Sequence, residues 1–161
     1  MAPIKRSKYL QPLSREHHFS LLFGWKLRQG IDLNISVKRM ISYVLYFETS
    51  MLIPHFKEEE DCLFIHDKGP LVQQAISEHK QILQLIDNFR QAPDSVQHSD
   101  LAVLADLLDH HVRFEERELF AYLETQLSTE QLAAVLQCTE NGPAVIDDFQ
   151  DAFWQEKKGS A

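Results

Sequence analysis

The sequence predicts an all-α protein, an up-down-up-down four-helix bundle with short extra helices at its C-terminus. The chain has only 5 Gly and 6 Pro among 161 residues, too few for the many tight turns of an all-β protein. Apolar residues recur at helical spacing in four long stretches that turn signals separate. A motif in the first two stretches returns in the last two, which indicates two helical hairpins packed as one bundle.

The first helix is expected over residues 13–29, after an irregular N-terminal arm over 1–12. Apolar residues at three- and four-residue spacing predict this helix, and a glycine and an aspartate follow it as break signals. The arm is basic, and we expect its Lys5, Arg6 and Lys8 to belong to a mobile tail.

The second helix should begin at Asp32 or Asn34, because both residue types are suitable N-caps. Its apolar pattern continues to about residue 63. Pro54 lies inside this pattern, and proline both lacks a backbone donor and clashes with the preceding turn. We therefore expect a kink in the second helix at Pro54.

The third helix is expected over 70–91, directly after a Lys-Gly-Pro turn, and the fourth over 99–126, after an Ala-Pro-Asp-Ser loop. Residues 13–126 then form the bundle as one domain. Residues 127–161 should pack on that bundle as a helical extension. A capping box at 128–131 predicts a short helix there, which Asn141-Gly142-Pro143 should break, and a last helical piece should end near Trp154.

Composition limits the classes of partner. Hydrophobic residues make up 44% of the chain and charged residues 25%, as in ordinary globular proteins, and the net charge of −8 argues against a nucleic-acid partner. No apolar run approaches the roughly 20 residues that span a bilayer, and no secretory signal is visible, so we expect a cytoplasmic protein without a membrane partner. Cys62 and Cys138 make neither a disulfide framework nor a zinc cluster, and Cys62 is expected to be a buried, inert thiol.

The repeated motif carries the chemistry. Residues 55–64 and 111–120 share a histidine, a basic residue, a Glu-Glu pair and a Leu-Phe pair in register. Upstream of each copy lies a Glu-His pair, at residues 16–17 and 78–79. In each copy the histidine and the first Glu of the shared Glu-Glu pair are four residues apart, which a helix places on one face.

These patterns predict a buried metal site. Six side chains should face the bundle interior: His17, His55, Glu59, His79, His111 and Glu115. Burying them without partners would cost several kcal/mol each, which a metal removes by taking up their nitrogens and oxygens. Imidazole with carboxylate suits iron, manganese or zinc. Six ligands exceed the four of a tetrahedral zinc and suit two ions bridged by Glu59 and Glu115.

Three further residues remain as alternative ligands. His18 is adjacent to His17, and His110 is adjacent to His111, so one member of each pair should face outward. The repeat selects His17 and His111, although His110 also has a workable spacing to Glu115. Glu58 lies three residues after His55 and is a further candidate, with membership of a solvated acidic run as its alternative.

The chain resembles the hemerythrin-like (HHE cation-binding) domain family. The stretches 14–18, 55–59 and 114–120 are similar to family signatures, and the resemblance covers roughly residues 13–124. It implies a carboxylate-bridged centre of two iron ions in an up-down-up-down bundle, with manganese or zinc as alternatives. Oxygen-carrying members have a histidine four residues before the third-helix histidine, where this chain has Ala75. This difference argues against a reversible oxygen carrier.

The resemblance implies a protein that binds or senses dioxygen or a related small ligand. Alternatives are a redox protein that handles iron, peroxide or nitric oxide stress, and a structural metal-binding module. No further acid, base or substrate pocket can be named, so catalytic residues are unknown and a binding role is expected over an enzyme. Because no output domain is attached, a sensor would act through a homodimer or a protein partner.

Overall fold

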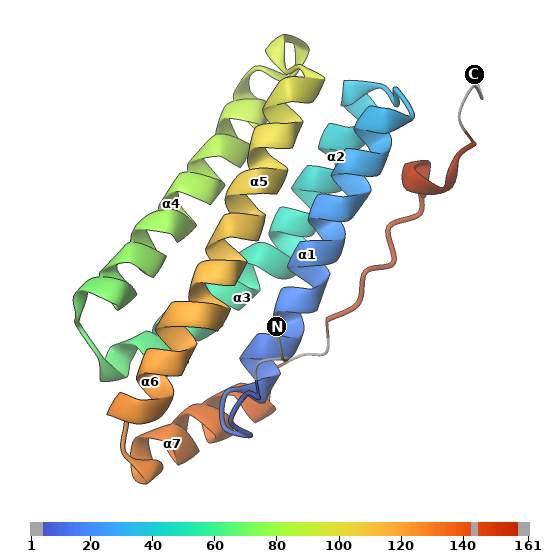
Figure 1. The fold of residues 1–161 in the computed structure, drawn as a ribbon. Helices are drawn as coiled ribbons and strands as arrows, with labels where there is room; N and C mark the ends of the chain where they lie inside the picture. The colour runs from blue at the N-terminus through green and yellow to red at the C-terminus, as the bar shows by residue number, and fades with distance from the viewer. Residues whose placement is uncertain (1–4, 143–144, 158–161) are drawn as a thin grey trace.

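The computed structural model describes residues 5–142 and 145–157, and over these residues the chain is all-α (Figure 1). Four helical columns lie side by side, and a shorter helix crosses one end of the bundle. In chain order the helices are α1 (Gln11–Asp32), α2 (Val37–Phe47), α3 (Ile53–Glu58), α4 (Pro70–Gln91), α5 (His98–Phe114), α6 (Phe120–Gln126) and α7 (Thr129–Glu140). The predicted all-α bundle is confirmed. Among the described residues no helix is both long and apolar enough to cross a membrane.

The connection between the first two columns differs from the expected one. α1 extends beyond 13–29 at both ends, and the chain then turns at Asn34, whose φ of 55° is one that asparagine tolerates. The N-cap of α2 is Ser36, whose hydroxyl accepts a hydrogen bond from the backbone N–H of Arg39. Asp32 and Asn34 as predicted N-caps are therefore wrong, because Asp32 still belongs to α1 and Asn34 makes the turn.

Pro54 lies where the second column changes helix type. A π turn over Glu48–Leu52 joins α2 to α3, and Pro54 stands in the first turn of α3. The column stays helical through this point, since the N–H of Ile53 bonds to the backbone oxygen of Glu48, five residues earlier, and Pro54 supplies no N–H for the next bond. The irregularity expected at Pro54 thus takes the form of a π turn immediately before it.

Two apolar clusters fill the bundle interior, and a polar belt lies between them. One cluster contains Phe23, Phe47 and Leu108, and the other contains Leu13 and Phe120. Each column contributes residues to both clusters and places a buried histidine where it passes from one to the other; these are His17, His55, His79 and His111. The belt therefore lies in the bundle interior, shielded by packed side chains on both sides.

The C-terminal extension begins as expected and then departs from the prediction. Ser128 and Gln131 form the predicted capping box of α7. The prediction of a final helical piece is wrong. Residues 145–152 run along the bundle without forming a helix, and the described residues after them make only a 3-10 turn at Phe153–Gln155 (Figure 1). Here side chains bind the bundle in place of a helix, and Asp147 accepts hydrogen bonds from Lys26 at 2.8 Å and Tyr43 at 2.7 Å. Pro143, part of the expected break, lies outside the described residues.

Arg6 attaches the basic N-terminal arm to the bundle. Its guanidinium is buried and forms ion pairs with Glu116 and Glu124, whereas Lys5 and Lys8 are exposed. The expectation of a mobile tail is therefore wrong for Arg6. A buried cation requires carboxylate partners, and only the folded chain shows that two are present beside it.

Cys62 is not the free thiol that we expected. It forms a disulfide with Cys138, with a distance of 5.7 Å between the two Cα atoms. The bond joins α7 to a π turn of the second column, and the two cysteines are 76 residues apart in the sequence. Sequence reasoning could not pair them, because the position of α7 depends on tertiary packing.

Candidate metal centre

The six side chains predicted to ligate a metal meet at the centre of the belt. They form two groups of possible ligands, one of His17, His55, Glu59 and Glu115 and the other of Glu59, His79, His111 and Glu115. Within each group the ligand atoms lie within 4.8 Å of one another. All six side chains are at most 3% exposed. The structure thus brings the six together, while their coordination of a metal stays a prediction.

Both glutamates are shared between the two groups, and each contacts three histidines. The Nε2 atoms of His17, His55 and His79 lie 3.2, 2.9 and 3.0 Å from oxygens of Glu59. Those of His17, His79 and His111 lie 3.1, 3.2 and 2.5 Å from oxygens of Glu115. Ligands at about 2.1 Å from one ion and at right angles to each other are about 3.0 Å apart. The spacing of these atoms therefore fits ligands that share metal ions.

A π turn begins at each of the two shared glutamates. Turns over Glu59–Leu63 and Glu115–Leu119 interrupt the second and fourth columns at equivalent positions of the repeat. Such turns are rare and occur often at functional sites, because they change the direction of the side chains around them. Here they lie where two consecutive glutamates both reach the histidine belt.

A second ring of carboxylates surrounds the histidines. The Nδ1 atom of each histidine lies close to one outer glutamate: His17 to Glu116 at 2.7 Å, His55 to Glu16 at 2.9 Å, His79 to Glu60 at 3.1 Å, and His111 to Glu78 at 2.8 Å. These four glutamates are candidate site residues that the sequence reasoning missed. The signal was present, since they are the remaining members of the repeated Glu-His and Glu-Glu pairs.

The outer carboxylates fix which imidazole nitrogen faces the centre. An ionised carboxylate only accepts hydrogen bonds, so each Nδ1 carries a proton and donates it. Nε2 then faces the centre and can bind a metal once it has lost its own proton, the arrangement found around metal-binding histidines. The Nε2 atoms of His55 and His111 lie close to Glu59 and Glu115, but these contacts lack hydrogen-bond geometry, so both Nε2 atoms and Oε2 of both glutamates are buried without a hydrogen bond. Buried polar atoms without partners are costly, and a metal would satisfy all four.

The electrostatics of the belt keep its carboxylates ionised. Burial lowers the pKa of His55, but Glu59 and Glu16 outweigh this effect and raise that pKa to about 9. For Glu115, burial raises the pKa, but the histidines, with His111 first, hold it well below its usual range. The glutamates are therefore charged at neutral pH, as metal ligands must be, and the histidines would release protons when a metal binds.

The three alternative ligands lie outside both groups. His18 and His110 are exposed, which contradicts them as ligands and agrees with the choice of His17 and His111. Glu58 is only half-buried, and burial together with Glu16 raises its pKa to about 7. It lines a hollow of about 450 Å³ between α1, α3 and the end of α7, beside the outer carboxylate of Glu16. Ala75 is fully buried in the apolar cluster.

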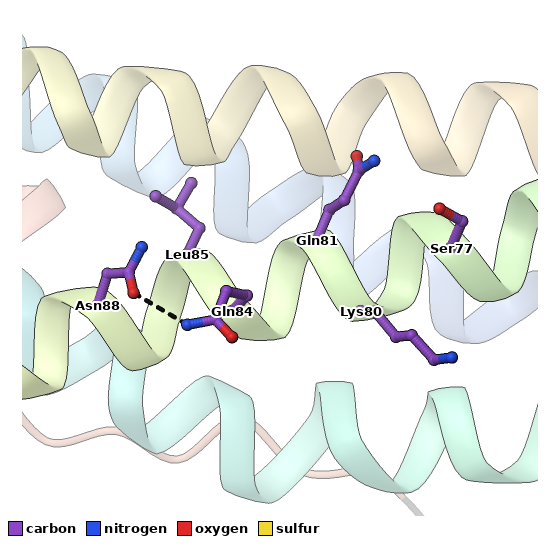
Figure 2. A pocket seen from close by; sticks show the side chains of 6 residues that line it. All are labelled: Ser77, Lys80, Gln81, Gln84, Leu85 and Asn88. Atoms are coloured by element: carbon purple, nitrogen blue, oxygen red, sulfur yellow. Dashed lines mark hydrogen bonds between the residues drawn. The ribbon is translucent and has the colours of Figure 1, made fainter.

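A hollow on the surface of α4 contains none of the site residues. Figure 2 shows its six lining side chains, all on this one helix, where Gln84 donates a hydrogen bond to Asn88 over 3.0 Å. Five of the six are exposed, and only Leu85 is half-buried. This hollow therefore contributes no residue to the candidate metal centre.

This architecture defines a class: helical bundles with a buried, carboxylate-linked His/Glu site for metal cations. The family model described as hemerythrin HHE cation binding domain matches residues 22–123, and the chain belongs to this family. The predicted family is confirmed. The match includes every inner ligand candidate except His17, which precedes it. Neither the curated proteins nor the solved structures include a match to this chain.

Proposed function

We propose that this protein is a hemerythrin-like non-heme di-iron protein that binds or senses dioxygen or a related small ligand. The observation that carries the proposal is the pair of buried ligand groups that share both glutamates. His17 and His55 would hold one ion, His79 and His111 the other, and Glu59 and Glu115 would bridge the two. Iron bound there supplies coordination positions for a small ligand and accessible changes of oxidation state.

Residues around the site would exclude water from it and orient its ligands. The two apolar clusters exclude bulk water from the belt, and the outer glutamates orient the imidazole rings. Each ion would receive two nitrogens and two carboxylate oxygens from the chain, fewer than the six ligands of an octahedral ion. Room for a small ligand would remain, and no catalytic residue is assigned. Manganese or zinc suits the same atoms.

We further propose that signalling, if the protein is a sensor, passes through a homodimer or a protein partner, without nucleic acid or membrane. The proposed compartment is the cytoplasm. Disulfides persist mainly in oxidising compartments, so the bond between Cys62 and Cys138 bears directly on this proposal. Alkylation of the protein during cell lysis should find both thiols reduced if the cytoplasm is its location, and a stable disulfide would contradict it.

The function is tested on the full chain reconstituted with ferrous iron without air. We expect about two irons per chain, as in other two-metal sites, and a visible absorption change that dioxygen causes and argon reverses. Irreversible oxidation with consumption of peroxide or nitric oxide would favour the redox alternative. Binding of zinc but not iron would favour a structural module.

Neighbouring histidines provide a matched pair for the same test. His111→Ala should lose about one ion per chain, because the other group keeps its own histidines. His110→Ala should keep both ions, since His110 is exposed. Equal metal contents in the two variants would contradict the assignment of His111, and absence of metal from the wild-type chain would overturn the whole proposal.

A further inference from the structure

The outer carboxylates Glu116 and Glu60 hold equivalent positions in the repeat but have different surroundings. Glu116 contacts His17 at 2.7 Å with a side chain 21% exposed, and Glu60 contacts His79 at 3.1 Å with a side chain 38% exposed. Glu116 also accepts a hydrogen bond from the hydroxyl of Ser14 over 2.6 Å. The residue equivalent to Ser14 in the second unit is Ile76, which has no hydroxyl.

Arg6 accounts for the rest of the difference. Its Nη2 lies 3.0 Å and its Nε 3.3 Å from Oε2 of Glu116, so two donors of one guanidinium hold the same carboxylate oxygen. Nη2 also donates to the backbone oxygen of Glu116, and Nη1 pairs with Glu124. The Arg6 side chain is only 6% exposed. The arm is therefore attached to the bundle through the residue that orients His17.

Phe120 contacts both Arg6 and the ring of His17. The Arg6 guanidinium lies 5.5 Å from the centre of the Phe120 ring, which in turn stacks on His17 at 5.4 Å. His79 stacks in the same way on Phe64, the equivalent of Phe120, at 5.9 Å, and it has in addition a closer stack on Phe56 at 3.9 Å. The position equivalent to Phe56 beside His17 is Val112, so His17 lacks this aromatic partner. Besides Phe120, its ring contacts Glu116, which Arg6 holds in place.

We propose that Arg6 is a positioning residue of the metal centre, which orients His17 through Glu116 and slows release of the ion held by His17 and His55. The inference rests on the proposed pair of metal ions and adds to it a role for the N-terminal arm. Outer partners of metal-bound histidines change metal affinity about 10- to 100-fold when removed. The loss of Arg6 should therefore affect one ion and leave the other, which Glu60 and the stacked phenylalanines support.

The test measures release of Co²⁺ from the full chain. The wild type is loaded with two equivalents, excess EDTA is added, and the visible absorption of protein-bound cobalt is followed with time. In Arg6→Gln we expect about half of the cobalt to leave roughly tenfold faster and the other half to leave at the wild-type rate. Glu116→Gln should give the same result, and the double variant should release no faster than either single variant, because both act on His17 by one route.

Two control variants separate positioning from simple attachment of the arm. Glu124→Gln removes the other carboxylate partner of Arg6. Arg39→Gln removes an ion pair with Asp151, in the C-terminal segment that follows α7. Both should release cobalt at wild-type rates. Unchanged release in Arg6→Gln, equal acceleration of both ions, or a Glu124→Gln result like that of Arg6→Gln would each overturn the inference. A wild type that binds no cobalt, iron, manganese or zinc would instead reject the proposed metal centre itself.

Discussion

The two halves of the chain agree at the metal-facing positions and differ in what supports them. Residues 16–17 and 55–60 of the first half match residues 78–79 and 111–116 of the second, in both the inner ligand candidates and the outer glutamates. The first half adds the arm, Pro54 directly before its histidine motif, and Cys62 of the disulfide. The inner side chains are therefore related by the repeat, whereas the contacts that support them differ between the two halves.

The differences fall on equivalent positions. Cys62 corresponds to Glu118, so only the first copy of the π turn is tied to α7. Glu58 corresponds to Phe114, which is buried in an apolar cluster, while Glu58 lines a surface hollow. The two halves therefore share the residues that meet at the centre of the bundle, and they differ at positions where each half contacts different parts of the chain.

The strongest way to break the comparison is to remove a shared carboxylate. Glu115→Ala should lose both ions, because Glu115 belongs to both ligand groups. Metal content by elemental analysis should fall from about two per chain to near zero. Glu118→Ala, an exposed change in the same π turn, should retain both ions. Retention of one ion by Glu115→Ala would show that the glutamates are not shared.

The next largest effect should come from the disulfide, which only the first half carries. Replacing Cys62 and Cys138 together by serine should lower the free energy of unfolding by about 4 kcal/mol, the loop-entropy value for cysteines 76 residues apart. Urea unfolding measures this difference. The wild type in reducing agent should match the double variant, and equal stability of the wild type with and without reducing agent would contradict the prediction.

The smallest effect should come from the outer glutamates whose surroundings are nearly equal. Glu16 and Glu78 are 17% and 14% exposed and lie 2.9 and 2.8 Å from their histidines. Glu16→Gln and Glu78→Gln should each weaken metal binding by about tenfold, measured by chelator competition. Glu130→Gln on the exposed side of α7 serves as the control. A large effect in only one of the two would mean that the two-fold relation ends at the inner ligands.

Much of the fold was accessible from local pattern. The four columns, the capping box of α7 and the inward choice of His17 over His18 follow from periodicity and the repeat, which short-range geometry governs. The prediction of a last helical piece was wrong because Asp147 and neighbouring carboxylates bind side chains of the bundle. These long-range contacts outweigh the local preference of the segment for a helix. The prediction of the α2 N-cap was wrong for a local reason, because three suitable N-cap residues, Asp32, Asn34 and Ser36, lie within five positions.

The sequence by itself determined the family, the helical columns and the six inward-facing side chains, because each of these depends on spacing within one helix or on repetition along the chain. Only the tertiary structure decided that Arg6 reaches Glu116, that Cys62 meets Cys138, and that each histidine receives its own outer glutamate. These contacts join residues far apart in the sequence. Their geometry is set by how the columns pack and not by the propensity of any one segment.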